Sequence, residues 1–191
     1  SMCEAADSID GPVYCRVLRG SMPRLFDTPI VVGQMRELSL GADVLIVTAG
    51  ITTEEAMRAT KALEASGVSV RHLHLNTIKP FNAEAMLDHI NSVKSGVITL
   101  ENHVTEGGIG SLVAEIMADN GVGKKLKRLG LNDTYAHGGS RAYLMRYYGL
   151  DALALTQGVE DLLGQKLDIT EKDLTEARVD AVHSLAKAEG L

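Results

Sequence analysis

The stretch GADVLIVTAGITTEEAMRATKAL, residues 41–63, decides the fold. Residues 44–47 are an unbroken run of aliphatic, mostly β-branched side chains, which is typical of a strand covered on both faces. Gly50 interrupts the run, and Thr52 or Thr53 can cap a helix whose apolar residues recur every three or four positions. A buried strand followed by an amphipathic helix predicts a β-α unit of a parallel sheet.

The same alternation continues toward the C-terminus. Short apolar segments at 68–75, 97–100 and 126–131 predict further strands, as expected of βαβ units. The segment 76–80, NTIKP, predicts a loop, because its proline excludes a central strand. Helical patterns cover 82–90, 112–117, 141–148 and 152–163. The chain is therefore expected to adopt an α/β fold with a mainly parallel sheet.

Both ends of the chain depart from this alternation. Residues 11–20, GPVYCRVLRG, predict a strand flanked by glycines and borrowed from a preceding domain, and an interdomain connector follows it. Residues 168–191 are highly charged but carry apolar residues at helical spacing, so they predict a C-terminal amphipathic helix. The expected parts are 1–29, a domain tail with connector; 30–165, the main domain; and 166–191, a helical extension.

Composition and charge exclude several partners. The 191 residues are 45% hydrophobic and 23% charged, within the range of ordinary globular domains. The net charge of −6 argues against nucleic acid, since binding a phosphate backbone requires a basic surface. The one basic cluster is interpreted as a solvated helix end or loop. It consists of Lys124, Lys125, Lys127 and Arg128.

Two further features concern the membrane and the cell compartment. The longest apolar run, residues 44–51, is far shorter than the roughly 18 residues that a membrane span needs. Cys3 and Cys15 form no spacing pattern, which predicts reduced thiols and a cytoplasmic protein.

A glycine-rich turn, GGIGS at residues 107–111, follows a predicted strand and opens a helix. Backbone amides at such a position can bind phosphate. However, the turn lacks the full spacing of dinucleotide-binding loops and has no lysine after it. We therefore favour a structural interpretation, in which Gly107, Gly108 and Gly110 let the helix pack closely on the strand.

Glu101 and His103 lie at the carboxyl end of a predicted strand, where open parallel sheets bind ligands. Two interpretations stay open: they form a ligand-edge loop with the glycine turn, or they satisfy backbone groups of the loop. His72 and His74 share one face of a strand and are expected to be solvent-facing or packed on the sheet. No catalytic residue and no metal site is predicted.

Five segments, in order, resemble the C-terminal domain of the transketolase family of thiamin diphosphate enzymes. They are VYCRVLRG at 13–20, the stretch 41–63, NTIKPFN at 76–82, ITLENHVTEGGIGSLVAE at 98–115 and GLNDTYAHGGSRAYLMRYYGLD at 130–151. The resemblance implies a three-layer α/β/α sandwich with a mostly parallel five-stranded sheet. It also implies a domain that supports the dimer and borders the substrate channel, and identifies residues 1–29 as the tail of a pyrimidine-binding domain.

The resemblance implies a function for the intact enzyme, which is transfer of a two-carbon ketol unit between sugar phosphates with thiamin diphosphate and Mg²⁺. The family's metal and diphosphate signature and its activating glutamate have no counterpart here, so the fragment is expected to bind no cofactor and to be inactive alone. Its expected partners are an N-terminal thiamin-binding portion or subunit and a second copy in a homodimer. Arg19 matches an arginine that holds the substrate phosphate; it can equally pair with a connector carboxylate such as Asp27.

Departures from the family pattern leave the subfamily open. Glu101-Asn102 stands where the family usually has two glutamates, and residues 136–139, AHGG, stand where Glu-Ser-Gly is common. The alternatives are a 1-deoxyxylulose-5-phosphate synthase, a 2-oxoacid dehydrogenase beta subunit, or a stand-alone module that binds a nucleotide or anion at the glycine turn. The roles of His137 and of the C-terminal extension are also open.

Overall fold

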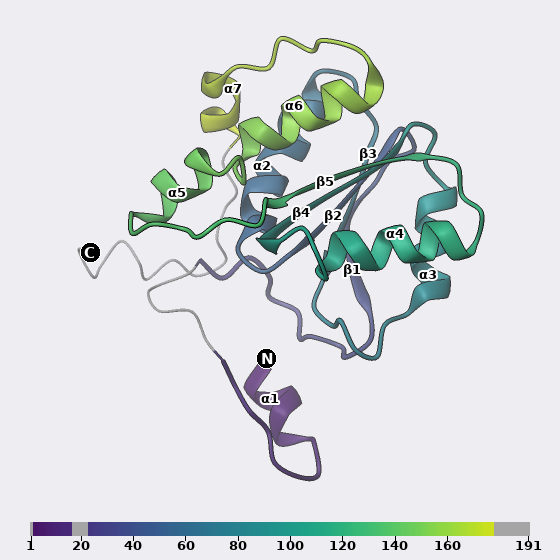
Figure 1. Ribbon diagram of the computed structural model, residues 1–191, viewed down its shortest axis with the longest axis vertical. Coiled ribbons are helices and arrows are strands. Elements are labelled where there is room, and N and C mark those ends of the chain that lie inside the picture. Colours follow the sequence, from purple (N-terminus) through teal and green to yellow (C-terminus); the bar gives the residue numbers. More distant parts are fainter. Residues whose placement is uncertain (1, 17–22, 178–191) are drawn as a thin grey trace.

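The computed structural model describes residues 2–16 and 23–177. Five strands form one sheet in the order β1-β3-β2-β4-β5, in which β1 runs antiparallel to β3 and the other pairs are parallel (Figure 1). Their bounds are β1 Met35–Leu40, β2 Val44–Ala49, β3 Val70–Leu75, β4 Gly96–Val104 and β5 Lys125–Leu131. The predicted five-stranded, mostly parallel sheet is confirmed.

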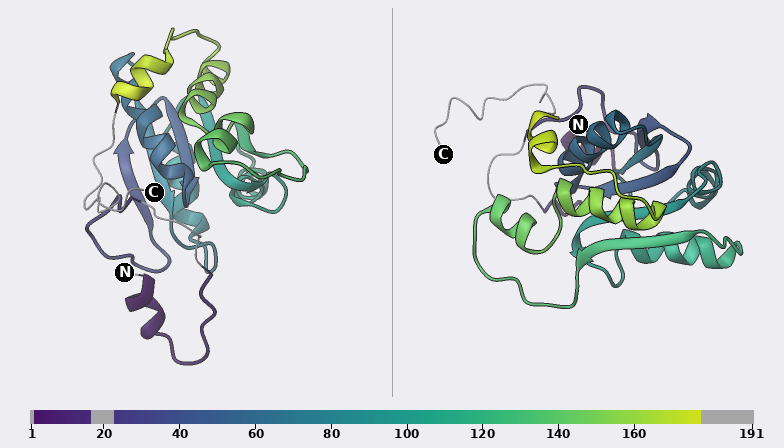
Figure 2. Two further views of the ribbon diagram at one scale, coloured as in Figure 1. Left: turned by 90° about the vertical axis from the view of Figure 1, so that its left-hand side faces the viewer. Right: turned by 90° about the horizontal axis from the view of Figure 1, so that it is seen from above.

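Helices cover both faces of this sheet, which gives the expected three-layer α/β/α sandwich (Figure 2). On one face lie α2 (Thr52–Ala65), α6 (Ala152–Leu163) and the short α7 (Glu171–Glu176). On the other face lie α3 (Ala83–Asn91) and α4 (Ile109–Asp119). Two further helices stand apart from the layers, α1 (Met2–Asp7) and α5 (Arg141–Tyr147).

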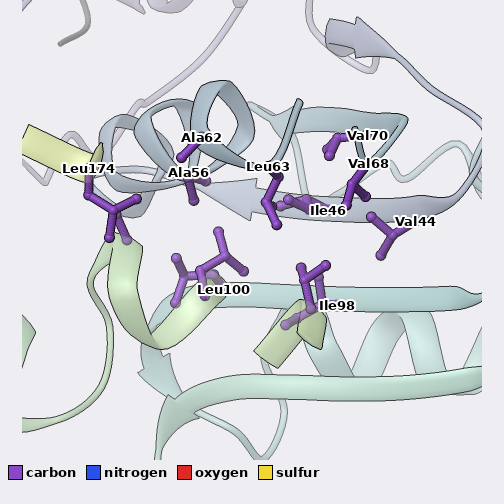
Figure 3. Packing of buried hydrophobic residues seen from close by; sticks show 14 of the residues in the cluster. Val44, Ile46, Ala56, Ala62, Leu63, Val68, Val70, Ile98, Leu100 and Leu174 are labelled. Carbon is purple, nitrogen blue, oxygen red and sulfur yellow. The ribbon is translucent and has the colours of Figure 1, made fainter. Parts of the chain in front are cut away.

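The position of β2 at the centre of the sheet explains why its sequence does not alternate between apolar and polar residues. Val44 and Ile46 point into the core under α2 and α6, as Figure 3 shows, whereas Leu45 and Val47 point into the core under α3 and α4. All four side chains are fully buried. A strand with helices on both faces needs apolar side chains at every position, and residues 44–47 meet that need.

The β2–α2 junction follows the prediction with one correction. Gly50 adopts a left-handed conformation with φ of 62°, which lets the chain turn from strand to helix. Helix α2 begins at Thr52, so the N-cap residue is Ile51 and neither threonine caps the helix. Instead, the buried hydroxyl of Thr52 lies 2.8 Å from the carbonyl oxygen of Leu100 and joins the helix to β4.

The N-terminal prediction is wrong where it can be compared. Residues 11–16 form no strand, and residues 17–20 of the predicted strand lie outside the described residues. Residues 23–33 are irregular, as expected of a connector. Two elements were missed: the short helix α1 and the edge strand β1, whose residues are only partly buried and show no clean alternation.

Within the described residues, the C-terminal extension forms the short helix α7, so the predicted helix can be compared only as far as residue 177. Helix α7 ends at Glu176, and the segment 178–191 of the predicted helix lies outside the described residues. Thr170 and Asp173 form a reciprocal capping box at its start. Leu174 is buried in the α2–α6 core, so this part of the extension packs on the main domain.

The basic cluster lies mostly on edge strand β5, so its assignment to a helix end or loop is wrong. Lys124, just before the strand, donates to three carbonyl oxygens at the end of α3, including those of Ile90 at 2.7 Å and Val93 at 2.6 Å. Lys127 forms an ion pair with Asp161 of α6. Lysines on an edge strand also protect its open backbone from pairing with another chain.

Candidate functional site

The carboxyl ends of the central strands open a crevice in the sheet. After β2 the chain crosses to one face of the sheet, and after β4 it crosses to the other. Between these two strand ends lies a cavity of about 410 Å³. It is lined by residues 49–51, Ile78, 101–103 and 107–109. In open α/β sheets, such a switch point is the usual place for a ligand.

Glu101 is the buried charged group of this crevice. Its two carboxylate oxygens accept hydrogen bonds from the backbone N–H groups of Ile109, at 2.8 Å, and Gly110, at 2.9 Å. Both donors belong to the first turn of α4, where the helix leaves its N–H groups without partners and where negative charge is favourable. The carboxylate thus occupies the amides that an anion would need, which disfavours a phosphate-binding turn.

Each of the three glycines in the turn has a structural reason to be a glycine. A side chain at Gly108 would place its Cβ 1.9 Å from a carboxylate oxygen of Glu101. A Cβ at Gly110 would lie 2.8 Å from the Thr99 hydroxyl and from Arg128. Gly107 has a φ of 72°, a left-handed conformation that favours glycine. Helix α4 thus packs closely on the strand, as the structural interpretation of the glycines expects.

His103 is exposed and lines the same cavity. Its Nδ1 lies 2.7 Å from the carbonyl oxygen of the adjacent Val104. Glu101 and His103 therefore both contact backbone groups, but these belong to the first turn of α4 and to the last residue of β4 and not to a loop. A ligand contact by either residue stays a prediction.

A second cavity, of about 360 Å³, adjoins the first and shares Ile51 and Asn102 with it. Its other walls come from the end of β5, the loop that follows it, and helix α5. Arg141 and Tyr148 contribute polar atoms to a lining that is otherwise mostly apolar. The two cavities together follow the carboxyl edge of β2, β4 and β5.

His72 and His74 belong to a chain of hydrogen-bonded side chains between the sheet and α2, which the sequence did not reveal. His72 lies 3.0 Å from Thr48 through Nε2 and 3.4 Å from Thr60 through Nδ1. The hydroxyl of Thr53 lies 3.1 Å from that of Thr48 and 2.8 Å from Nδ1 of His74. Every ring nitrogen named here is therefore paired with a threonine, not with a metal-ligating side chain.

Burial governs the charge of these histidines. Desolvation, with a smaller contribution from the neighbouring His74, lowers the pKa of His72 to about 3. Desolvation and the Arg36 guanidinium lower the pKa of His74 to about 4. His72 is thus packed on the sheet and neutral at pH 7, so the solvent-facing alternative is wrong. Within residues 2–16 and 23–177, no three His, Cys, Asp or Glu side chains are grouped to hold a metal ion.

The connector reaches the domain at the same edge, beside a third cavity that includes His74. Arg36 of β1 lies 4.5 Å above the ring of Phe26 and donates to the carbonyl oxygens of Thr28 and Pro29, each at 3.0 Å. These contacts fix residues 26–29 against the ends of β1 and β3. Arg19, the predicted phosphate-binding residue, lies outside the described residues.

The chain folds into a doubly wound α/β domain. Its connector and the three cavities lie at the carboxyl edge of the sheet. The model of the family described as "Transketolase, C-terminal domain" matches residues 33–155, and the chain belongs to that family. The match covers the whole sheet and all helices from α2 to α5. It confirms the resemblance found in the four sequence segments from residue 41 onward, whereas the segment 13–20 lies outside the match.

Two of the curated relatives are named as a section or a subunit of a transketolase. The chain is 35% identical over 153 residues to the putative transketolase C-terminal section of Methanocaldococcus jannaschii, covering 78% of this chain and 47% of the relative. It is 36% identical over 145 residues to a subunit of the apulose-4-phosphate transketolase of Actinobacillus succinogenes, covering 74% of this chain and 46% of the relative. The chain thus spans about half the length of these relatives.

The solved structures contain a similar protein. A chain described as "Split gene transketolase, inactive beta4 tetramer" superposes with a TM-score of 0.77 at 32% sequence identity. The alignment covers 86% of this chain and 54% of that one. As for the membrane, no helix in the described part of this chain has the length and apolar character needed to cross one.

Proposed function

We propose that this chain is the C-terminal portion of a transketolase-like enzyme that transfers a two-carbon ketol unit between sugar phosphates. The observation that carries the proposal is the family match over residues 33–155, together with relatives named as sections or subunits of transketolases. Each of those relatives is about twice as long as the matched region. In this proposal, the catalytic steps of ketol transfer take place on an N-terminal portion or partner subunit.

In this proposal, thiamin diphosphate and Mg²⁺ are held by the N-terminal portion. The cofactor supplies the carbanion chemistry of ketol transfer when it is bound. Among the described residues, no three acidic, histidine or cysteine side chains are grouped to hold the metal ion, which supports placing it in the N-terminal portion. The role of this chain is accordingly to support the assembly and to border the path of the substrate.

Two comparisons support the assignment of partners. One relative is named as a subunit of a transketolase, and the similar solved structure is described as an inactive beta4 tetramer of a split-gene transketolase. We therefore expect this chain to be inactive alone, to act with an N-terminal partner and to form a homodimer within the assembly.

The experiment measures ketose-to-aldose transfer between sugar phosphates by three samples with thiamin diphosphate and Mg²⁺. The samples are this chain, its N-terminal portion, and the two combined. The proposal expects turnover only in the combined sample. Absence of transfer across a panel of sugar phosphates, with cofactor demonstrably bound to the combined sample, would reject ketol transfer.

Arg19 is proposed to hold the phosphate of the substrate, since a guanidinium presents a planar fork to phosphate oxygens. In the combined enzyme, Arg19→Ala should raise the KM about tenfold or more for phosphorylated sugars, as expected for the loss of a charge-assisted contact. Unphosphorylated sugars should show little change. The matched control is Arg16→Ala, three residues earlier, and an equal rise for both sugar classes would remove Arg19 from the phosphate site.

A second candidate is the C-terminal domain of a 1-deoxyxylulose-5-phosphate synthase. The enzyme of that name from Geobacter sulfurreducens is 33% identical over 172 residues, covering 86% of this chain, more than the transketolase section of Methanocaldococcus covers. The same combined sample distinguishes the two candidates. Formation of 1-deoxy-D-xylulose 5-phosphate without ketol transfer between sugar phosphates would favour the synthase.

A further inference from the structure

The connector meets the sheet through a stack of three side chains, those of Arg36, Phe26 and His74. Arg36 and His74 are direct neighbours in the antiparallel pairing of β1 with β3. The centroid of the Phe26 ring lies 4.5 Å from the Arg36 guanidinium and 5.3 Å from the centroid of the His74 ring. The connector therefore covers a titratable side chain that the proposed function does not use.

Hydrogen bonds from Arg36 extend this contact along the connector. The guanidinium donates to the hydroxyl and the carbonyl oxygen of Thr28 and to the carbonyl oxygen of Pro29. Residues 27–29 themselves are exposed, so burial of their own side chains does not hold them. A segment held by so few contacts can open locally while the sheet stays folded. Residues 26–29 are called here the latch.

His74 makes the latch sensitive to charge. Its Nδ1 lies 2.8 Å from the hydroxyl of Thr53 in α2. Desolvation, with a smaller contribution from the Arg36 guanidinium, lowers the pKa of His74 to about 4, so the ring is neutral at pH 7. Protonation places a second cation beside Arg36. The Phe26 ring already faces the guanidinium, so it offers the new charge little compensation.

The other groups around His74 do not neutralise such a charge. Thr53 and His72 face it from α2 and from its own strand, and both are neutral at pH 7. His74 lines a cavity of about 560 Å³ with three further charged residues, all of them exposed. They are Glu4 of α1 and Arg24 and Asp27 of the connector. Solvent screens exposed charges, which leaves Arg36 as the dominant charge acting on His74.

Opening of the latch changes the surroundings of His74. When the Phe26 ring leaves, the imidazole regains contact with water, and its pKa moves back toward the ordinary value. The open latch therefore favours protonation, and by thermodynamic reciprocity protonation favours the open latch. We propose that residues 26–29 are a pH-sensitive latch, which is docked on β1 and β3 while His74 is neutral and is released when His74 takes up a proton.

The direction of the pH effect follows from proton binding by the two states. The open state binds more protons than the docked state between about pH 4 and pH 6.5, the docked and ordinary pKa values of this histidine. Docking is thus complete above this range and weakens as the pH falls through it. For one proton, the docking equilibrium constant changes by up to about tenfold per pH unit. This device acts within the chain and does not depend on ketol transfer.

A fluorescent reporter tests the latch, because the chain has no tryptophan of its own. Phe26→Trp keeps an aromatic ring in the stack and adds a unique fluorophore. Quenching of this tryptophan by acrylamide is measured between pH 7 and about pH 4.5, with circular dichroism at each pH. The quenching constant should rise about threefold or more while the circular dichroism stays constant, as expected for a ring that leaves its cover. Constant quenching, or a rise that follows loss of the folded signal, would overturn the proposal.

Three variants in this reporter chain assign the pH response. His74→Gln should abolish it. His89→Gln should keep it, and is the matched control because His89 of α3 is also a partly buried histidine whose pKa is lowered by desolvation. Arg36→Ala should leave the tryptophan accessible at every pH, because the hydrogen bonds to residues 28–29 are lost. A pH response that survives in His74→Gln would contradict the latch.

Titration of His74 by NMR tests the same linkage without the reporter. Phe26→Ser should raise the proton affinity of His74 about threefold or more, because the ring that excludes water is gone. Val31→Ser is the matched control at an exposed apolar residue of the same irregular segment, and should leave the titration unchanged. Identical titrations of His74 in the wild type and in Phe26→Ser would refute the proposal. Neither measurement uses substrate or cofactor, so their failure would leave the proposed function untouched.

Discussion

Glu101 joins the end of β4 to the first turn of α4 through two charge-assisted hydrogen bonds. Glu101→Gln preserves the shape but turns an NH₂ group toward one of the backbone donors. We expect a loss of about 1–3 kcal/mol in the free energy of unfolding, the cost of leaving a buried donor without its partner. Urea denaturation at pH 7 measures it. Asn102→Ala, at the exposed neighbouring residue, serves as control, and an equal loss in both variants would contradict the account.

His72 makes the stability of the chain depend on pH. Unfolded histidine takes up a proton near pH 6.5, whereas folded His72 does so only near pH 3. The unfolded state therefore binds more protons between these values, so the contribution to stability is complete above about pH 6.5 and falls as the pH drops. The slope approaches about 1.4 kcal/mol per pH unit for one proton. Because His74 has a pKa of about 4, it adds to the same loss.

The variant His72→Gln should reduce this pH dependence, because it removes the proton that His72 takes up on unfolding. Glutamine also retains an amide group that can reach the hydroxyl of Thr48. Unfolding free energies measured between pH 6.5 and 5 give the comparison, a range in which few carboxylates titrate. A variant whose stability falls with the wild-type slope would show that His72 is not the group that is protonated.

His72 and Glu101 also show how much the sequence reveals about the role of a single residue. The two-residue spacing of His72 and His74 correctly places them on one face of a strand. Nothing in that spacing indicates that the face is covered by α2 or that its threonines reach the rings. Likewise, Glu101 is recognisable as a candidate, but its partners in α4 follow eight and nine positions later, beyond a turn whose geometry the sequence does not fix.

At the scale of elements, the turn between β1 and β2 depends on a close approach of its backbone to the backbone at the start of β3. A Cβ at Gly41 would lie 2.3 Å from backbone atoms of Ser69 and Val70. Gly41→Ala should therefore lower the free energy of unfolding by about 2 kcal/mol or more, since backbone on both sides must shift. Gly123→Ala is the matched control, because its Cβ would meet nothing within 4 Å. Thermal or urea unfolding of both variants compares them, and equal stability of the two would refute this packing.

The elements that were predicted correctly carry their signals within short stretches of sequence. Strand β2 is apolar at every position, and α2 repeats its small apolar residues at helical spacing, so each is recognisable alone. Strand β1, MRELSL, was missed because it lies at the sheet edge and is only partly buried. Its position depends on antiparallel pairing with β3, a contact between distant segments. The strand predicted at 11–20 shows the opposite error, in which favourable residues form no strand over 11–16.

At the scale of the whole molecule, the carboxyl edge of the sheet gathers the features that concern function. The connector arrives there at Arg36, and the crevice cavities open there. The loop that leads to α5 also leaves the sheet at this edge, after β5. We therefore expect this edge to face the rest of the enzyme.

The order of the five sequence segments was sufficient to identify the family, because most of these segments form an element or turn of the domain. Groups of side chains that come from separate elements were not predicted in the same way. The ring of His137 contacts those of Tyr143 and Tyr147 because the loop before α5 folds back over this helix. A surface assembled from a loop and a helix leaves no periodic pattern in the sequence.

The central claim is that this chain completes a transketolase-like enzyme without carrying the chemistry itself. The most direct measurement titrates the N-terminal portion with this chain and follows ketol transfer between sugar phosphates in the presence of thiamin diphosphate and Mg²⁺. The account predicts no turnover by either portion alone and activity that rises to a plateau at equal amounts of the two. Turnover by this chain alone, or no transfer from the saturated mixture with cofactor bound, would contradict it.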